Sequence, residues 1–227
     1  MEKGVERMTP ERLNRLNTTL SNRQPDLTVV LDQVDKPFNL SAILRSCDAA
    51  GVWEAHAVYP RKVGRRTTQG YSAGVGKWVN LECHDSIDAV ISGLHQRGFS
   101  VYAAHPSGNA RDFREVSYVH PTAILMGSEL DGVSPRGLEL ADEHVQIPMM
   151  GMGMSLNVSV ATALILYEAQ RQRIARGLYE SCRLPEEVYE PTLFEWAHPA
   201  VAAYCRRHGL KYPALREDGE LAEPLQR

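Results

Sequence analysis

Three segments of the chain carry side chains whose types and spacing could support chemistry. In the first, an amide, Asn39, precedes an arginine, Arg45, by six residues. In the second, GSELDGV, the carboxylate of Glu129 lies between two glycines. The third runs from an apolar strand through a glycine loop to a helix start near Asn157. A guanidinium supplies a permanent positive charge, and a loop between a strand and a helix is where nucleotide-like ligands bind.

Each of these patterns also has an ordinary structural explanation. Gly151 and Gly153 lack a third glycine, so they form neither a dinucleotide-binding fingerprint nor a P-loop. A glycine loop before a helix is most often only a turn. Asn39 is a typical N-cap residue, Arg45 a typical surface arginine, and Glu129 a typical helix-capping acid. Taken one by one, the patterns favour structural roles.

Alternating strands and helices would position these segments. Apolar runs predict strands, while amphipathic segments with N-cap residues and closing glycines predict helices. The strands are expected at 27–31, 55–59, 78–83, 99–104, 122–126 and 144–147, and the helices at 9–22, 39–51, 86–97, from 135, 157–177 and near 191–208. This rhythm predicts an α/β fold with an open, mostly parallel sheet and helices on both faces. The strand ends at Ala104, Gly127 and Ile147 should then lie side by side, where such sheets bind ligands.

The helix that follows Asn157 begins with an almost uniformly apolar run, which predicts that its first half is buried on all sides. The net charge of the 227-residue chain is −3, so any RNA contact must come from local arginine clusters. A solvated surface is the ordinary alternative for each cluster. The candidates are Arg12, Arg15 and Arg23 near the N-terminus, Arg65 and Arg66 in a loop, and Arg171 and Arg173 late in the long helix.

The spacing of the cysteines and histidines indicates the cellular compartment and whether a metal site is expected. Four cysteines are scattered without a CxxC pair, and eight histidines are dispersed without HxxxH-type pairs. This pattern suits the reducing cytoplasm, and we expect no metal site. The chain shows neither a signal peptide nor a run long and apolar enough to span a bilayer. One moderate domain with extensions is expected at this length.

Taken together, the three segments resemble a known family. The third, which follows the pattern IPMxGxxxSLNVSxA, resembles a motif of the SPOUT methyltransferases, in particular the TrmH (SpoU) family of RNA ribose 2′-O-methyltransferases. The spacing N-x-x-x-x-x-R matches that family's first motif, and GSELDGV resembles its second. The resemblance covers roughly residues 25–177.

This resemblance implies a methyl donor, S-adenosylmethionine, held by backbone groups of three loops. It also implies a deep C-terminal trefoil knot and an obligate homodimer. Carried over by position, the donor-binding residues are Ala104, Gly127, Ile147, Met149, Ser155 and Leu156. The implied division is an N-terminal helical extension that contacts RNA, 1–24, a SPOUT domain, 25–177, and a C-terminal helical extension with a tail, 178–227.

Catalytic roles carry over to Arg45, Asn39, Glu129 and Asn157. A guanidinium, with a pKa above ~12, hardly deprotonates in proteins. We therefore expect Arg45 to grip phosphate and stabilise a developing alkoxide, with Asn39 and Asn157 orienting it and Glu129 anchoring them.

The segments RQPDLTV and EAQRQR resemble the tRNA-modifying subgroup, which methylates guanosine 18 of the D-loop. Two alternatives stay open. One is a ribosomal RNA 2′-O-methyltransferase of the same family, although members of that group usually carry a separate N-terminal RNA-binding domain. The other is a non-catalytic RNA-binding dimer with this fold. That alternative predicts loss of Arg45, Asn157 or the donor loops, all of which are present.

Overall fold

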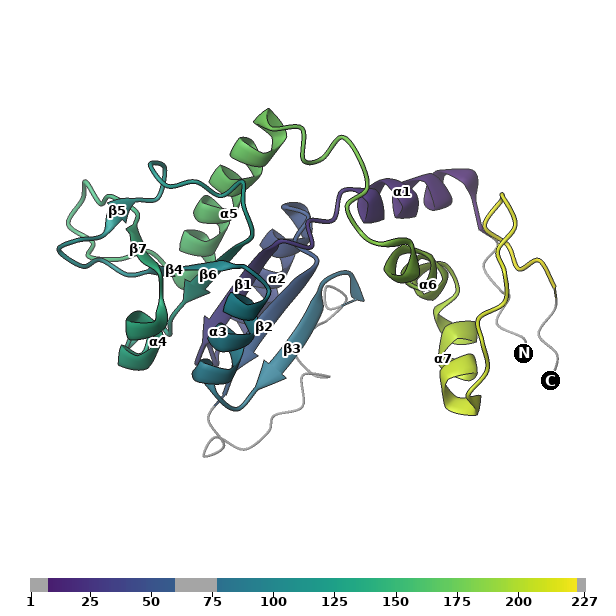
Figure 1. Cartoon of the computed structure of the whole chain (residues 1–227), viewed down its shortest axis with the longest axis horizontal. Coiled ribbons are helices and arrows are strands. Elements are labelled where there is room, and N and C mark those ends of the chain that lie inside the picture. The colour runs from purple at the N-terminus through teal and green to yellow at the C-terminus, as the bar shows by residue number, and fades with distance from the viewer. Residues whose placement is uncertain (1–7, 60–76, 224–227) are drawn as a thin grey trace. The chain divides into compact units, whose positions relative to one another are not determined.

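The computed structural model describes residues 8–59 and 77–223, which divide into two compact units. The larger unit, Gln24–Tyr179, contains a seven-stranded sheet (Figure 1). Every strand pairing in this sheet is parallel, and the order is β3-β2-β1-β6-β4-β7-β5. The strands are β1 Leu27–Asp32, β2 Glu54–Val58, β3 Asn80–His84, β4 Ser100–Ala104, β5 Arg111–Asp112, β6 Thr122–Met126 and β7 Glu143–Gln146. The predicted α/β class and parallel sheet are confirmed, whereas the short β5 was not predicted.

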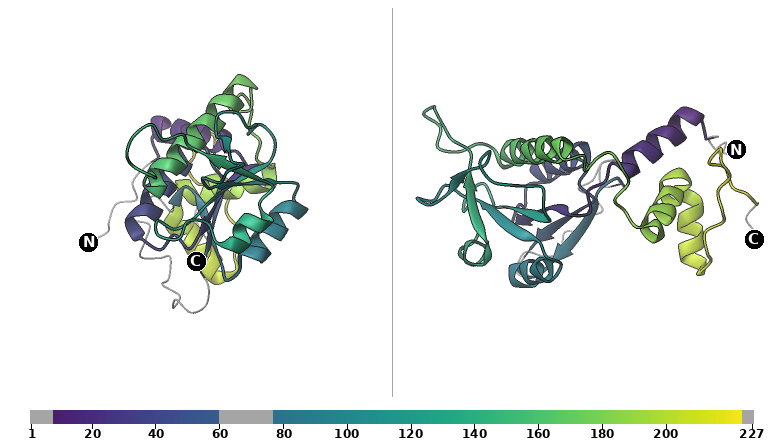
Figure 2. Two further views of the ribbon diagram at one scale, coloured as in Figure 1. Left: turned by 90° about the vertical axis from the view of Figure 1, so that its left-hand side faces the viewer. Right: turned by 45° about the horizontal axis from the view of Figure 1, so that its top comes forward.

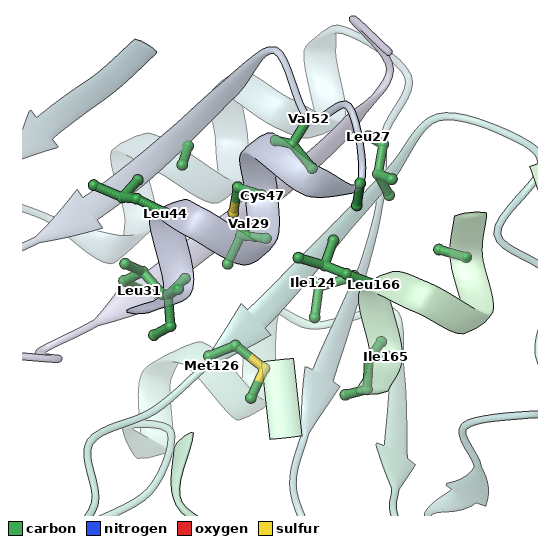
Figure 3. Close-up of a cluster of buried hydrophobic side chains, with 14 of the residues drawn as sticks. Leu27, Val29, Leu31, Leu44, Cys47, Val52, Ile124, Met126, Ile165 and Leu166 are labelled. Carbon is green, nitrogen blue, oxygen red and sulfur yellow. The ribbon is translucent and has the colours of Figure 1, made fainter. Parts of the chain in front are cut away.

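Helices cover both faces of this sheet (Figure 2). One face packs against α2, Pro37–Ala49, and α5, Val158–Ala175, and the other against α3, Ile87–Gln96, and α4, Pro135–Leu140. Strand residues alternate between the two cores, as the pleat requires. Figure 3 shows the first core, in which side chains of α2 and α5 meet those of β1 and β6. The labelled members include Leu44 and Cys47 of α2, Ile165 and Leu166 of α5, Val29 and Leu31 of β1, and Ile124 and Met126 of β6.

The long helix α5 differs from its prediction in burial. Its N-cap, Asn157, and its closing glycine, Gly177 with φ 70°, are as expected. However, one side of the helix is solvent-exposed, with Val160, Leu164 and Tyr167 exposed by 47%, 42% and 52%. The expectation of burial on all sides is therefore wrong for a single chain, because only the side facing α2 and the sheet is covered.

The smaller unit consists of Met1–Arg23 and Glu180–Arg227. Its helix α1, Pro10–Ser21, begins after the predicted N-cap, Thr9, and packs against α6, Glu186–Ala197. A third helix, α7, covers Pro199–His208. The single helix expected near 191–208 is thus two helices that meet at His198. Pro199 explains the break, because the residue before a proline is driven out of the helical region. No helix in the described ranges is long and apolar enough to cross a membrane.

Candidate active site

The carboxyl edge of the parallel sheet brings together the loops that carry the sequence motifs. Strands β6, β4 and β7 are consecutive neighbours, so Ala104, Gly127 and Ile147 lie at or just beyond three adjacent strand ends, as predicted. The segment before α2 leaves the same edge after β1, and the loop before α5 leaves it after β7. Residues more than a hundred positions apart therefore converge here.

Gly127 occupies a position that admits no side chain. A Cβ atom there would lie 1.9 Å from the backbone carbon of Gly132 and 2.0 Å from the nitrogen of Val133. The loop folds back this closely because Ser128 and Gly132 exchange two backbone hydrogen bonds, at 3.0 and 3.1 Å. Gly132 has a φ of 68°, in the left-handed region that favours glycine. Both glycines of GSELDGV thus shape the turn that presents Glu129.

Three of the four predicted catalytic residues form one hydrogen-bonded cluster. The side-chain amide of Asn157 donates to Glu129 Oε1 at 2.7 Å and to Asn39 Oδ1 at 3.1 Å. Asn157 Oδ1 caps α5 by accepting from the backbone nitrogen of Ser159 at 2.9 Å. The cluster therefore joins the starts of α2 and α5 to the loop after β6.

Two further residues complete this cluster. Lys36 Nζ forms an ion pair with Glu129 Oε2, and the hydroxyl of Ser159 donates to Asn157 Oδ1 at 2.5 Å. Sequence reasoning missed both, although Lys36 directly precedes Pro37 and Ser159 directly follows the first residue of α5. The expectation that Asn39 or Ser41 caps α2 is wrong. Pro37 starts the helix two residues earlier, so the Asn39 side chain is released to face Asn157.

Arg45 does not join the cluster within this chain. Its side chain is exposed and makes no hydrogen bond or ion pair with the described residues. Six residues of α-helix place it about 9 Å beyond Asn39 along α2 and on a different side of the helix. Neither Asn39 nor Asn157 therefore orients Arg45 in a single subunit, which differs from the expected arrangement.

The loop before α5 is suited to a ligand held by main-chain groups. Met149, Ser155 and Leu156 are exposed in it, and residues 148–156 form no backbone–backbone hydrogen bond with other described residues. Amide donors and carbonyl acceptors are thus uncommitted beside apolar side chains. This combination fits an adenosine with an uncharged ribose better than a phosphate, which would call for a glycine-rich cradle at a helix N-terminus.

Two of the arginines predicted to contact RNA are buried instead. Arg173 is 0% exposed, and its guanidinium pairs with Asp26 at 2.6 Å. Arg23 is also 0% exposed, with its guanidinium carbon 5.5 Å from the ring centre of Trp196. A phosphate cannot reach either guanidinium in this structure, so the predicted RNA contacts of Arg173 and Arg23 are corrected to structural roles.

The other predicted RNA-contact residues differ in exposure. On α1, Arg12 is partly buried and Arg15 is exposed. Arg171 is exposed on α5, where hydrogen bonds with Glu168 at 2.7 and 2.9 Å raise the pKa of its guanidinium. Arg65 and Arg66 lie outside the described residues. Arg12, Arg15 and Arg171 therefore stay candidates for phosphate contact.

Comparison with known proteins gives consistent matches over nearly the whole chain. Residues 26–167 match the model of the SpoU rRNA Methylase family, and residues 171–224 match that of the SpoU rRNA methylase C-terminal region. The chain is 48% identical to a tRNA (guanosine(18)-2′-O)-methyltransferase of Escherichia coli (strain K12) over 216 residues, 94% of each chain.

Solved structures agree with these matches. A TrmH/SpoU tRNA modifying enzyme of A. aeolicus superposes with a TM-score of 0.76 at 43% identity, covering 84% of this chain and 97% of that one. The SpoU methyltransferase AviRb of Streptomyces viridochromogenes, in complex with the cofactor AdoMet, superposes with a TM-score of 0.59 at 26% identity, covering 74% and 66%.

Proposed function

The chain belongs to the SpoU methylase family, and on that premise we propose that it methylates the ribose 2′-hydroxyl of guanosine 18 in tRNA, with S-adenosylmethionine as the methyl donor. One observation carries the proposal. Asn39, Glu129 and Asn157 meet at the ligand-binding edge of the sheet, in a chain that is 48% identical to an enzyme with this activity. The same match favours tRNA over ribosomal RNA as the acceptor.

We assign donor binding to the three strand ends and the loop before α5. Ala104, Gly127 and Ile147 supply the strand ends, and Met149, Ser155 and Leu156 belong to the loop. When bound, S-adenosylmethionine supplies an electrophilic methyl group on a positively charged sulfur. The cluster of Asn39, Glu129 and Asn157 ties this loop to α2, which keeps the pocket in shape before the donor enters.

We assign Arg45 to the binding of the methyl acceptor, the ribose 2′-hydroxyl. A ribose hydroxyl is a weak nucleophile, and its oxygen gains negative charge as it attacks. A guanidinium within hydrogen-bond distance stabilises that charge and also holds the neighbouring phosphate in line. Arg45 suits this role because it is exposed and carries no ion pair among the described residues that would neutralise it.

The geometry favours a site built from two subunits. The uncovered side chains of Val160, Leu164 and Tyr167 lie one or two turns apart along one side of α5, which is the pattern of a helix that packs against a partner. We propose a homodimer formed through this surface. Since Arg45 does not reach the cluster in its own chain, it would act on the pocket of the second subunit. The trefoil knot and the cytoplasmic location stay predictions.

Methyl transfer to defined RNAs tests the activity. With labelled donor, we expect one methyl group per tRNA transcript at guanosine 18, and none on a transcript in which that guanosine alone is replaced or on ribosomal RNA. Arg45→Lys should lower turnover by about 100-fold or more, because a point charge cannot hold two oxygens in the fixed fork geometry. Arg136→Lys, a change on the opposite face of the sheet, should leave it unchanged. Near-normal turnover of Arg45→Lys would remove Arg45 from the chemistry.

Mixed dimers test the two-subunit site. Arg45→Ala and Asn157→Ala should each be inactive alone. If Arg45 serves the partner's pocket, random reassembly of equal amounts makes half of the dimers mixed, each with one intact site. About a quarter of the wild-type activity should then return. If Arg45 serves its own pocket, every site in every dimer is defective, and no recovery is seen.

A further inference from the structure

A cluster of two histidines and a carboxylate lies at the β3 edge of the sheet, apart from the strand ends that form the proposed active site. His56 lies on β2, and Glu82 and His84 lie on β3. In the parallel register His56 pairs with Glu82, and Val58 pairs with His84. Because alternate strand residues share a face, all three side chains project toward the face that α3 covers.

The three potential ligand atoms lie at nearly equal distances from one another. His56 Nδ1 is 3.1 Å from His84 Nε2 and 3.6 Å from Glu82 Oε2, and the last two atoms are 3.7 Å apart. Zinc in proteins is bound tetrahedrally, with bonds of about 2.0–2.2 Å, which places its ligand atoms roughly 3.3–3.5 Å from each other. A shift of a few tenths of an ångström would therefore allow all three atoms to bind one ion.

We propose that His56, Glu82 and His84 form a binding site for a divalent transition-metal ion of zinc-like chemistry. Two imidazoles and one carboxylate are a donor set that such ions prefer over calcium or magnesium, and three protein ligands leave a fourth position for water. The ion would bridge β2 to the edge strand β3, so its effect is on the stability of that edge and on none of the residues assigned to methyl transfer.

The surroundings of His56 support this assignment. Its side chain is 5% exposed, and its second ring nitrogen, Nε2, lies 3.7 Å from Glu54 Oε1 without a hydrogen bond. Arg97 holds the same carboxylate oxygen at 2.6 Å. A histidine that binds a metal through one nitrogen commonly directs its other N–H at a carboxylate, and Glu54 occupies that place.

Metal binding would also set the tautomers of both rings. A neutral imidazole is the form that ligates metals. With the ion bound, the remaining ring protons would sit on His56 Nε2 and His84 Nδ1, so both rings stay neutral and only their tautomers are set.

A direct hydrogen bond between the two rings is the competing explanation of the 3.1 Å contact. Binding of cobalt(II), a coloured substitute for zinc, distinguishes the two. We expect the untagged, chelator-treated full-length protein to bind one cobalt ion per chain, with the intense visible absorption of a four-coordinate site, and zinc to displace it. A hundredfold excess of zinc over its dissociation constant should raise the midpoint of thermal unfolding by about 5–10 °C.

Single substitutions locate the ion. Glu82→Gln and His84→Gln should each weaken binding by about tenfold or more, and Glu82→Gln should fold normally because its side chain is 48% exposed. Two controls should bind as the wild type does: Cys83→Ser, which removes an exposed thiol on the same strand, and His95→Gln, which removes a surface histidine. Absence of cobalt binding, unchanged binding by His84→Gln, or loss of binding in Cys83→Ser would each overturn the proposal.

Discussion

Replacing Arg173 by methionine separates a structural role from an RNA-binding one. The guanidinium of Arg173 is fully buried and donates five hydrogen bonds. Two go to the carboxylate and the carbonyl of Asp26, at 2.6 and 3.0 Å. The others reach the carbonyls of Tyr118 and His120 and the side-chain oxygen of Gln24, at 2.8, 3.0 and 3.1 Å. Arg173 thereby ties α5 to the segments that lead into β1 and β6.

Methionine preserves most of the apolar packing but removes the buried guanidinium that pairs with Asp26, whose side chain is only 15% exposed. Removing one partner of a buried ion pair costs about 3–5 kcal/mol. For a domain of this size, each kcal/mol shifts the unfolding midpoint by about 2–4 °C, so Arg173→Met should lower it by about 6–20 °C. Affinity for tRNA, measured well below the new midpoint, should be unchanged.

The same substitution two residues earlier is the matched control. Arg171 is 67% exposed, and among the described residues its guanidinium pairs only with Glu168 on its own helix. Arg171→Met should leave the unfolding midpoint unchanged and weaken tRNA binding. The slope of log affinity against log salt concentration should become shallower by about one, as expected for loss of one phosphate contact. Thermal unfolding and salt-dependent tRNA binding measure both variants. A stable Arg173→Met protein that had lost tRNA binding would refute the structural assignment.

Two further predictions concern the binding site for S-adenosylmethionine and the dimer. Gly127→Ala drives a methyl group into the backbone of Gly132, so S-adenosylmethionine binding by calorimetry should be lost, at a cost in stability of about 1–3 kcal/mol or more. Gly93→Ala, on α3 and also with no atom within 4 Å of the added carbon, should bind normally, and equal binding by both variants would contradict the steric reason. Leu164→Glu should make the protein monomeric, as measured by light scattering, because it places a charge in the proposed interface. Leu210→Glu, which replaces another exposed leucine, should leave the dimer intact. A dimeric Leu164→Glu protein would exclude α5 from the interface.

Local patterns determined much of the fold. Strand length, apolar periodicity and capping residues predicted β1, β4, β6, α1, α3 and the ends of α5 to within a few residues. Because parallel strands all end at one edge, the same patterns also predicted that Ala104, Gly127 and Ile147 meet. Where a local rule competed with another, the prediction was wrong: Pro37 displaced the expected cap of α2, and Pro199 divided the last helix.

Burial and contact depended on the tertiary structure, because both are set by segments distant in sequence. Nothing in EAQRQR distinguishes Arg171 from Arg173, yet the turn of α5 exposes the first and buries the second beside Asp26. The dispersed histidines predicted no metal site, whereas the register of β2 with β3 places His56 next to Glu82 and His84. The order of amino-acid types along the chain thus specifies which helices and strands form and which motifs are present. Which charged groups meet, and which stay open to a ligand, follows from how the sheet and its helices pack.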